Sequence, residues 1–216
     1  AFNSRASSIV KSPFTSAISD KNRHIESAIT RLKVLLESWS FSIIALKKSG
    51  IRMHIRKAIG EDLKDIMAIY KTAQDFMIKT GNPTQWGHSY PTRDLVKKDI
   101  CKRICYLICD DDSPHGIFAL FNKAEPTYQY IENGNWLNED EYITLHRIAS
   151  DGKLKGIFNF LIEYCKNISN NIRIDTHPNN HIMQNQIEKN DFKKCGTIYV
   201  ADGSARIAYQ WSKNHE

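Results

Sequence analysis

Two kinds of apolar pattern alternate along the chain from Met53 onward. Short runs rich in isoleucine, leucine and aromatic residues predict strands, and apolar residues spaced three or four apart predict helices. The predicted strands cover residues 53–58, 104–109, 115–122, 142–148, 172–176, 191–200 and 205–211. The predicted helices cover residues 61–80, 93–102, 157–167 and 179–190.

Turn-forming residues separate these segments. A Gly-Asn-Pro sequence ends the first helix and opens a loop at 81–92 that is rich in glycine, proline and aromatic residues. The stretches 110–114 and 201–204 predict hairpin turns, and the polar residues 123–140 predict a loop or an extended arm. The element order predicts an α/β fold, with a mixed, mostly antiparallel twisted sheet and helices on both faces.

The first 52 residues differ from the rest in charge. They carry nine Lys or Arg and three Asp or Glu, so the net charge of +6 belongs to this segment and residues 53–216 are neutral. A neutral main part argues against a nucleic-acid partner. We therefore predict a basic extension at 1–52 and a domain at 53–216.

The extension is predicted to contain one amphipathic helix at 22–48, from apolar residues at helical spacing. Packing on the domain, dimerisation and binding to an anionic surface are its open roles, and packing is the commonest. The Ser-rich, acid-poor first twenty residues fit a transit peptide or a disordered tail. Residues 1–52 as a whole fit a native extension or a segment foreign to the natural product.

Apolar run length and cysteine content indicate the compartment. No apolar run approaches the roughly 20 residues that span a bilayer, so no membrane span is predicted. Five cysteines, an odd number, lie within apolar segments, which favours buried, reduced thiols and a cytoplasmic location over a disulfide framework. Cys101, Cys105 and Cys109 lack a Cys-x-x-Cys pair, so we predict no metal site.

The stretch TLHRIASDGKLKGIFNFLIEYC, residues 144–165, joins a predicted strand to a predicted helix through a loop with two glycines and two lysines. The first turn of a helix has unpaired N–H groups and the positive end of the helix dipole, so such a loop can bind a phosphate. An ordinary strand-to-helix connection, with Asp151-Gly152 as a turn, explains the same residues.

Three stretches together point to a known family. They are MHIRKAIGEDLKDIMAIY, the stretch TLHRIASDGKLKGIFNFLIEYC, and RIDTHPNNHIMQNQIEKNDFKKCGTIYV. In this order they resemble the first strand and helix, the acetyl-CoA motif, and the following strand, helix and strand of the Gcn5-related N-acetyltransferase (GNAT) family. The resemblance covers about residues 53–212 and implies the GNAT fold, with acetyl-CoA as co-substrate.

The resemblance implies a phosphate loop of the pattern [Arg/Gln]-x-x-Gly-x-[Gly/Ala], aligned here on residues 153–158. Positive charge is kept at the first position and glycine at the fourth, but a phenylalanine stands where a tiny residue is usual and would crowd the cofactor. In the family, backbone amides hold the diphosphate. The cofactor residues expected in the loop are Lys153, Lys155, Gly156, Ile157 and Phe158.

The resemblance also implies that the strands before and after this loop splay apart to admit the pantetheine arm of the cofactor. The backbone at Arg147, Ile148 and Ser150 would hold that arm. Asn180 would hydrogen-bond it, and the alternative role for Asn180 is a helix N-cap. Many members carry a tyrosine in the next helix that protonates the leaving thiolate. Ile187 takes its place here, so that role is not carried over.

Histidines are the candidate bases, because their unperturbed pKa lies near working pH. His146 on the motif strand and His177 after the next strand both lie near the predicted splay. Their alternative roles are a packed side chain and a turn or capping residue, respectively. In the loop 81–92, Trp86 and Tyr90 are candidate substrate contacts, and anchoring of the loop is the alternative.

The leading hypothesis is an enzyme that transfers an acetyl group from acetyl-CoA to a primary amine of a small molecule or peptide. Direct attack needs positioning, a base and an oxyanion donor, and no metal. An acyl-CoA-binding module without turnover is the alternative, and an interaction protein that uses its basic helix is a third reading. A homodimer is left open.

Overall fold

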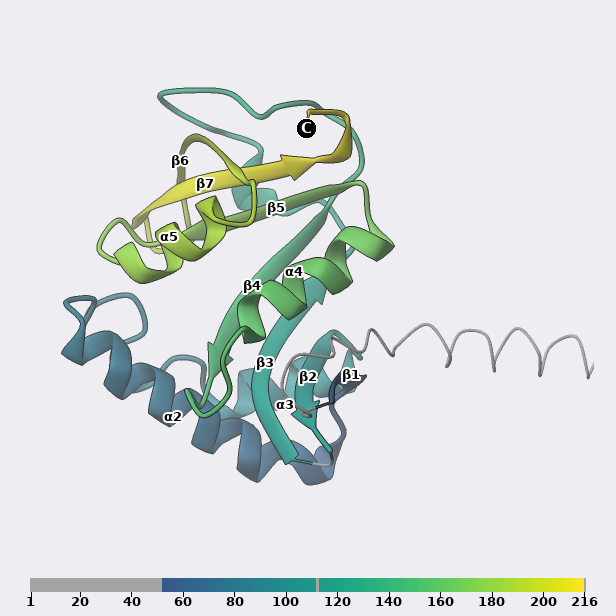
Figure 1. The fold of residues 1–216 in the computed structure, drawn as a ribbon. Helices are drawn as coiled ribbons and strands as arrows, with labels where there is room; N and C mark the ends of the chain where they lie inside the picture. Colours follow the sequence, from purple (N-terminus) through teal and green to yellow (C-terminus); the bar gives the residue numbers. More distant parts are fainter. Residues whose placement is uncertain (1–51, 112, 216) are drawn as a thin grey trace, which may run out of the picture. The chain divides into compact units, whose positions relative to one another are not determined.

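A computed structural model describes residues 52–111 and 113–215, so the rest of the predicted extension and its helix lie outside the described residues. The described chain forms a seven-stranded sheet with the order β1-β2-β3-β4-β5-β7-β6 (Figure 1). The strands are β1 (Met53–Lys57), β2 (Cys105–Asp110), β3 (Ser113–Phe121), β4 (Ile143–Ser150), β5 (Asn171–Thr176), β6 (Lys193–Tyr199) and β7 (Ala205–Ser212). The helices are α2 (Leu63–Lys79), α3 (Arg93–Cys101), α4 (Ile157–Ile168) and α5 (His181–Glu188).

Neighbouring strands are antiparallel except β4 and β5, which are parallel. This confirms the predicted mixed, mostly antiparallel sheet. The pairs between β4 and β5 are Ile143 with Ile172, Thr144 with Arg173, and Leu145 with Ile174. Beyond these pairs the two strands diverge towards their carboxyl ends (Figure 1). The predicted splay is therefore present.

A β-bulge in β4 lies just beyond the last of these pairs. Ile117 of β3 faces Ala149, and Ala119 faces His146, so β4 has one residue more than β3 in this interval. Arg147 has a left-handed φ of 53° at the bulge. The bulge therefore bends β4 where it leaves β5.

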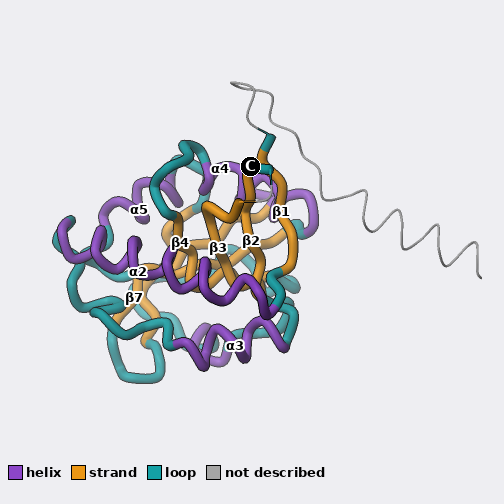
Figure 2. Tube along the Cα trace, turned by 90° about the horizontal axis from the view of Figure 1, so that it is seen from below, coloured by secondary structure: helices purple, strands orange, loops and turns teal. Residues whose placement is uncertain are grey.

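Successive residues of the central strands bury their side chains on opposite faces of the sheet. Leu107 joins a buried cluster with residues of α2 and α3, such as Tyr70 and Val96. Its neighbour Ile108 joins a second cluster with residues of α4, such as Phe160. Figure 2 shows α2 and α3 on one side of the strands and α4 on the other. Helices on both faces are thus confirmed.

The polar stretch after β3 is an extended arm, residues 122–142, which contains a short 3₁₀ helix, η2 (Pro126–Tyr128). Its Tyr128 is buried in a cluster with Ile198 of β6 and Ala208 of β7. An isolated β-bridge joins Glu132 to Thr197. The arm therefore packs against the last hairpin.

Two further contacts fix the arm. The guanidinium carbon of Arg173 on β5 lies 4.1 Å from the ring centroids of both Trp136 and Tyr142. Gly134 approaches β6 so closely that a Cβ atom there would lie 2.0 Å from the carbonyl oxygen of Cys195. Only glycine fits at this crossing.

Three details differ from the sequence predictions. β4 continues to residue 150 because it stays paired with β3 beyond its separation from β5. α5 is shorter than 179–190, because Asn180 caps it and its first helical residue is His181. Cys101 is exposed at the end of α3, whereas the other four cysteines are buried. In the described ranges, no helix is long and apolar enough to cross a membrane.

Candidate active site

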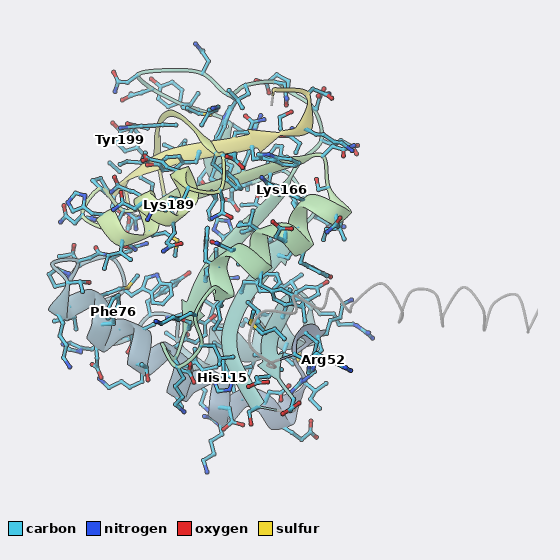
Figure 3. The ribbon with its side chains drawn as sticks, viewed as in Figure 1. Arg52, Phe76, His115, Lys166, Lys189 and Tyr199 are labelled. Carbon is cyan, nitrogen blue, oxygen red and sulfur yellow. The ribbon has the colours of Figure 1, made fainter. Side chains whose placement is uncertain are left out.

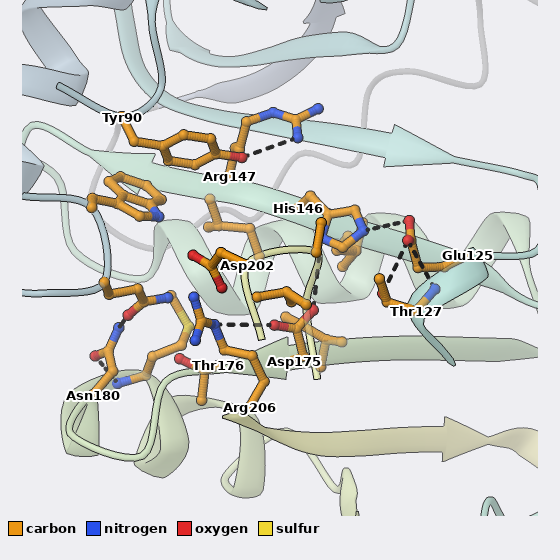
Figure 4. Close-up of a pocket in the computed structure, with 18 of the residues that line it drawn as sticks. Tyr90, Glu125, Thr127, His146, Arg147, Asp175, Thr176, Asn180, Asp202 and Arg206 are labelled. Carbon is orange, nitrogen blue, oxygen red and sulfur yellow. Dashed lines mark hydrogen bonds and ion pairs between the residues drawn. The ribbon is translucent and has the colours of Figure 1, made fainter. Parts of the chain in front are cut away.

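A cavity of about 520 Å³ opens where β4 and β5 separate (Figure 4). Its walls come from the end of α2, the loop 81–92, the arm, the carboxyl ends of β4 and β5, the start of α5 and the β6–β7 turn. Segments far apart in the sequence therefore meet at the point where two parallel strands leave a gap.

His146 of β4 lies in this cavity between two carboxylates (Figure 4). Its Nε2 atom lies 3.3 Å from Oε2 of Glu125 on the arm, and its Nδ1 atom lies 3.8 Å from Oδ1 of Asp175 on β5. The hydrogen bond with His146 lowers the pKa of Glu125 to about 2, so Glu125 is ionised at neutral pH. The imidazole ring also packs edge-on against Phe121. Its orientation is thus fixed from several sides.

Asp175 connects the histidine to the buried Tyr128 and to Arg206, which lines the cavity. Its Oδ1 atom accepts a 2.8 Å hydrogen bond from the hydroxyl of Tyr128. Burial and the nearby carboxylate raise the pKa of Tyr128, which keeps its proton. The Oδ2 atom of Asp175 lies 3.9 Å from Nε of Arg206 on β7. Arg206 in turn donates from Nη1 to Ser204 Oγ at 2.8 Å.

Arg147, the residue after His146, belongs to a separate ion pair. Its Nη2 atom lies 2.9 Å from Oδ2 of Asp99 on α3, and both side chains are almost fully buried. Burial raises the pKa of Asp99, although Arg147 opposes the shift. The carbonyl oxygen of Arg147 accepts a 3.2 Å hydrogen bond from the hydroxyl of Tyr70. That oxygen, predicted for the cofactor, is already bonded to α2.

The loop 81–92 supplies an aromatic wall. Trp86 is buried, and its ring meets Tyr70 edge-on at 5.7 Å and Tyr90 at a tilt at 6.2 Å. Gln74 of α2 donates to the carbonyl oxygen of Tyr90 at 2.9 Å. Tyr90 is 38% exposed. Both aromatic residues line the cavity, and Trp86 also anchors the loop to α2.

The predicted phosphate loop lies at the amino end of α4, outside the residues that line the cavity. Gly156 precedes the helix with a left-handed φ of 81°, and no side chain caps the first turn. Asp151 shapes the loop by accepting the N–H of Lys153 at 3.0 Å. His115 at the start of β3 holds Asp151 in turn, with 2.8 Å between Nδ1 and Oδ2 (Figure 3).

The remaining loop residues divide into buried and exposed side chains. Ile157 belongs to the hydrophobic core, and the partly buried ring of Phe158 packs against this core. Lys153 and Lys155 are exposed. Ser150 is the last residue of β4 and pairs with Gly116 of β3. Side chains at 157 and 158 therefore face the core, and the helix start presents backbone.

The structure brings six of the predicted site residues together at the cavity: Trp86, Tyr90, His146, Arg147, Ile148 and Asn180. Asn180 is the N-cap of α5, where its side chain accepts from the N–H of Met183 at 3.1 Å, so the alternative role is present. It also donates to Gln85 Oε1 at 3.0 Å, which ties α5 to the loop 81–92.

His177 lies after β5 and is not among the cavity-lining residues. Its Nδ1 atom accepts a 3.1 Å hydrogen bond from the N–H of Asn179, which is the turn geometry of its alternative role. Burial lowers the pKa of His177. Ile187, at the position of the family's tyrosine, is fully buried in the core and offers no proton.

Sequence reasoning missed Glu125, Asp175 and Arg206 as cavity residues. Asp175 and Arg206 carried a signal, because each is a charged residue inside a predicted strand. Glu125 carried none, since it lies in a polar stretch whose position depends on how the arm packs.

No protein-family model matches the chain, and no curated protein matches it. Solved structures do match. A GNAT-family acetyltransferase from Streptococcus agalactiae superposes with a TM-score of 0.69 and 27% identity, over 75% of this chain and 96% of its own. The domain has the GNAT fold. A GNAT-family acetyltransferase from Listeria monocytogenes shares the fold, with a TM-score of 0.57 and 15% identity over 77% of this chain and 98% of its own.

The fold of the GNAT domain confirms the resemblance that three sequence stretches indicated. The similarity supports an acetyl-CoA-dependent N-acetyltransferase, and it does not favour a binding module that lacks turnover.

Proposed function

We propose that the GNAT domain binds acetyl-CoA in the gap between β4 and β5 and transfers its acetyl group to a primary amine by direct attack. The separation of these strands after Leu145 and Ile174 is the observation that supports this most. It leaves the β5-facing edge of β4 without a partner strand. An extended pantetheine arm can pair with such an edge, at Ile148 and Ser150, as an added strand does.

The diphosphate of the cofactor would lie at the start of α4. No side chain caps this helix, so its first N–H groups are available to an anion. A Cβ atom added at Gly156 would meet no atom within 4 Å, so the space there is open. Phe158 packs against the core, and Lys153 and Lys155 add positive charge. These residues fit a diphosphate.

His146 is the proposed general base. The ammonium form of the acceptor gives a proton to His146, and the freed nitrogen attacks the carbonyl carbon of the thioester. The carbon–sulfur bond then breaks and the acetyl group stays on nitrogen. The second proton on that nitrogen passes to the departing sulfur, so coenzyme A leaves as the thiol. Glu125 and Asp175 stabilise the imidazolium that forms, because both carboxylates lie within 4 Å of its nitrogens.

Two other predicted roles remain part of the proposal. Trp86 and Tyr90 would form the wall against which the acceptor lies. His177 is the second candidate base, and the lowered pKa keeps it neutral at working pH. Its position outside the cavity lining makes His146 the stronger candidate.

Replacement of His146 tests the proposal. We expect His146→Gln to lower kcat/KM for amine acetylation by about a hundredfold, the usual contribution of a general base. Binding of acetyl-CoA, measured by calorimetry, should stay unchanged. His54→Gln on β1 is the matched control and should keep full activity, since His54 does not line the cavity.

Two results would contradict the proposal. Cofactor binding without thiol release for any amine would indicate an acyl-CoA-binding module. No binding at millimolar acetyl-CoA would show that the GNAT fold here does not hold the cofactor at all.

A further inference from the structure

The charges that line the cavity do not balance. Three carboxylates face it from three elements, namely Glu125, Asp175 and Asp202, against the guanidinium groups of Arg147 and Arg206. Arg147 is neutralised by a carboxylate outside the cavity lining, at 2.9 Å. Three carboxylates then face one guanidinium, that of Arg206, at the part of the cavity where the acceptor would lie. This excess of negative charge favours cations.

Asp202, on the turn between β6 and β7, is the least compensated of these carboxylates. Its Oδ1 atom accepts from the N–H and the hydroxyl of Ser204, and these bonds lower its pKa. In the described part of the chain, no lysine or arginine nitrogen lies within 4 Å of it. Asp202 is exposed to solvent at the rim of the cavity, and as an anion it can accept further hydrogen bonds there.

Thr176 independently indicates a ligand in the same cavity. The residue is 1% exposed and lines the cavity, and its hydroxyl oxygen has no hydrogen-bond partner among the described residues. Figure 4 shows Thr176 on the cavity wall next to Arg206. A buried hydroxyl without a partner is rare in folded proteins and is explained by a missing ligand or water.

Arg206 does not make this end an anion site. Its Nη1 atom already donates to Ser204 Oγ and to the carbonyl oxygen of Ala205, at 2.8 and 3.0 Å. Its Nε atom faces Asp175 at 3.9 Å. A carboxylate on the acceptor would meet a guanidinium that already faces Asp175, together with the repulsion of Asp175 and Asp202.

We propose that the acceptor is a di- or polyamine, with the reacting amine at His146 and a second, distal ammonium group held by Asp202 and the hydroxyl of Thr176. This inference rests on the proposed acetyl transfer and narrows its substrate class. An ammonium group can donate to the carboxylate of Asp202 and to the hydroxyl oxygen of Thr176. The Thr176 hydroxyl would then have the hydrogen-bond partner that it lacks.

Three acceptors with the same reacting end test the inference: 1,4-diaminobutane, butylamine and 4-aminobutyrate. They differ at the far end only, which is an ammonium, a methyl or a carboxylate group. We expect kcat/KM for the diamine to exceed that for butylamine by about tenfold, the effect of one charge-assisted hydrogen bond, and 4-aminobutyrate to be the poorest. The diamine preference should shrink at high salt.

Asp202→Asn should lower the ratio of kcat/KM for diamine over butylamine by about tenfold, because it removes the charge and keeps the turn acceptor. Asp65→Asn on the exposed face of α2 is the control and should leave this ratio unchanged. Equal values for diamine and butylamine in the wild type would overturn the inference while acetyl transfer stands. A preference for 4-aminobutyrate would overturn it in favour of an anion site. Failure of every amine would overturn both proposals.

Discussion

Two consecutive residues of β4, His146 and Arg147, enter separate networks. His146 faces Glu125 of the arm and Asp175 of β5, whereas Arg147 pairs with Asp99 of α3. The side chains of His146 and Arg147 both contact the ring of Phe121, at 5.4 Å each, and the bulge at Arg147 marks the place where β4 turns away from β5. The residue proposed for proton transfer is therefore next to the one that fixes the strand.

Glu125 should make stability depend on pH in the acid range. Its pKa in the fold is about 2 against an ordinary 4.5, chiefly because of the hydrogen bond with His146. A carboxyl group with a lowered pKa stabilises the fold fully above pH 4.5 and loses this contribution as the pH falls towards about 2. We predict that Glu125→Gln lowers the free energy of unfolding at neutral pH, by a difference from wild type that shrinks below pH 4.5.

Urea denaturation at a series of pH values measures this difference. Glu163→Gln on the exposed side of α4 is the control and should parallel the wild type throughout. A Glu125→Gln difference that is constant down to the lowest pH at which the protein folds would contradict the assigned hydrogen bond between Glu125 and His146.

The arm is the element that completes the site, because it delivers Glu125 to the cavity from outside the sheet. Its position depends on contacts with β5 and β6, chiefly the rings around Arg173 and the close approach of Gly134 to Cys195. The position of Glu125 relative to His146, the proposed base on β4, is thus set partly by packing at the other end of the sheet.

Gly134→Ala tests this dependence. The added Cβ atom would lie 2.0 Å from a backbone oxygen, which cannot yield as a flexible side chain would. We predict a loss of about 1–3 kcal/mol in the free energy of unfolding, together with lower acetylation activity, as the arm shifts. Gly60→Ala, where nothing lies within 4 Å, should change stability by less than about 0.5 kcal/mol. Equal stability of the two variants would show that the arm tolerates displacement.

Local signals account for what the sequence predicted correctly. Apolar periodicity and turn residues act over short distances, so they indicated each strand and helix. Gly156 of the predicted phosphate loop is also a local signal, because its left-handed φ of 81° favours glycine. The contact between Glu125 and His146 could not be predicted in this way. The contact depends on how the arm packs, and that packing uses the guanidinium of Arg173 between the rings of Trp136 and Tyr142. It also depends on the bulge in β4, which no local sequence pattern predicts.

At the scale of the whole molecule, the cavity and the start of α4 both lie near the carboxyl end of β4, where this strand separates from β5. The residues that line the cavity fall between Met77 and Arg206, and the phosphate loop lies within the same interval. Every group proposed for binding or catalysis therefore belongs to the GNAT domain.

Removal of residues 1–52 should accordingly leave acetyl transfer intact. The shortened chain begins at Met53, the first residue of β1. We predict a Kd for acetyl-CoA and a kcat/KM within about twofold of the full chain, as expected for changes distant from a site. Loss of cofactor binding with retained folding would show that the basic segment takes part in the site.

Among the described residues, only three strand-paired positions join the block of four strands, β1 to β4, to the block of three, β5 to β7, within the sheet. A molecule bound in the gap between β4 and β5 can form the backbone hydrogen bonds that the separated strands do not form with each other. It would then connect the two blocks. Motion of one block relative to the other should decrease when the cofactor binds and increase when coenzyme A dissociates. The rigidity of the domain would then rise and fall once in every catalytic cycle.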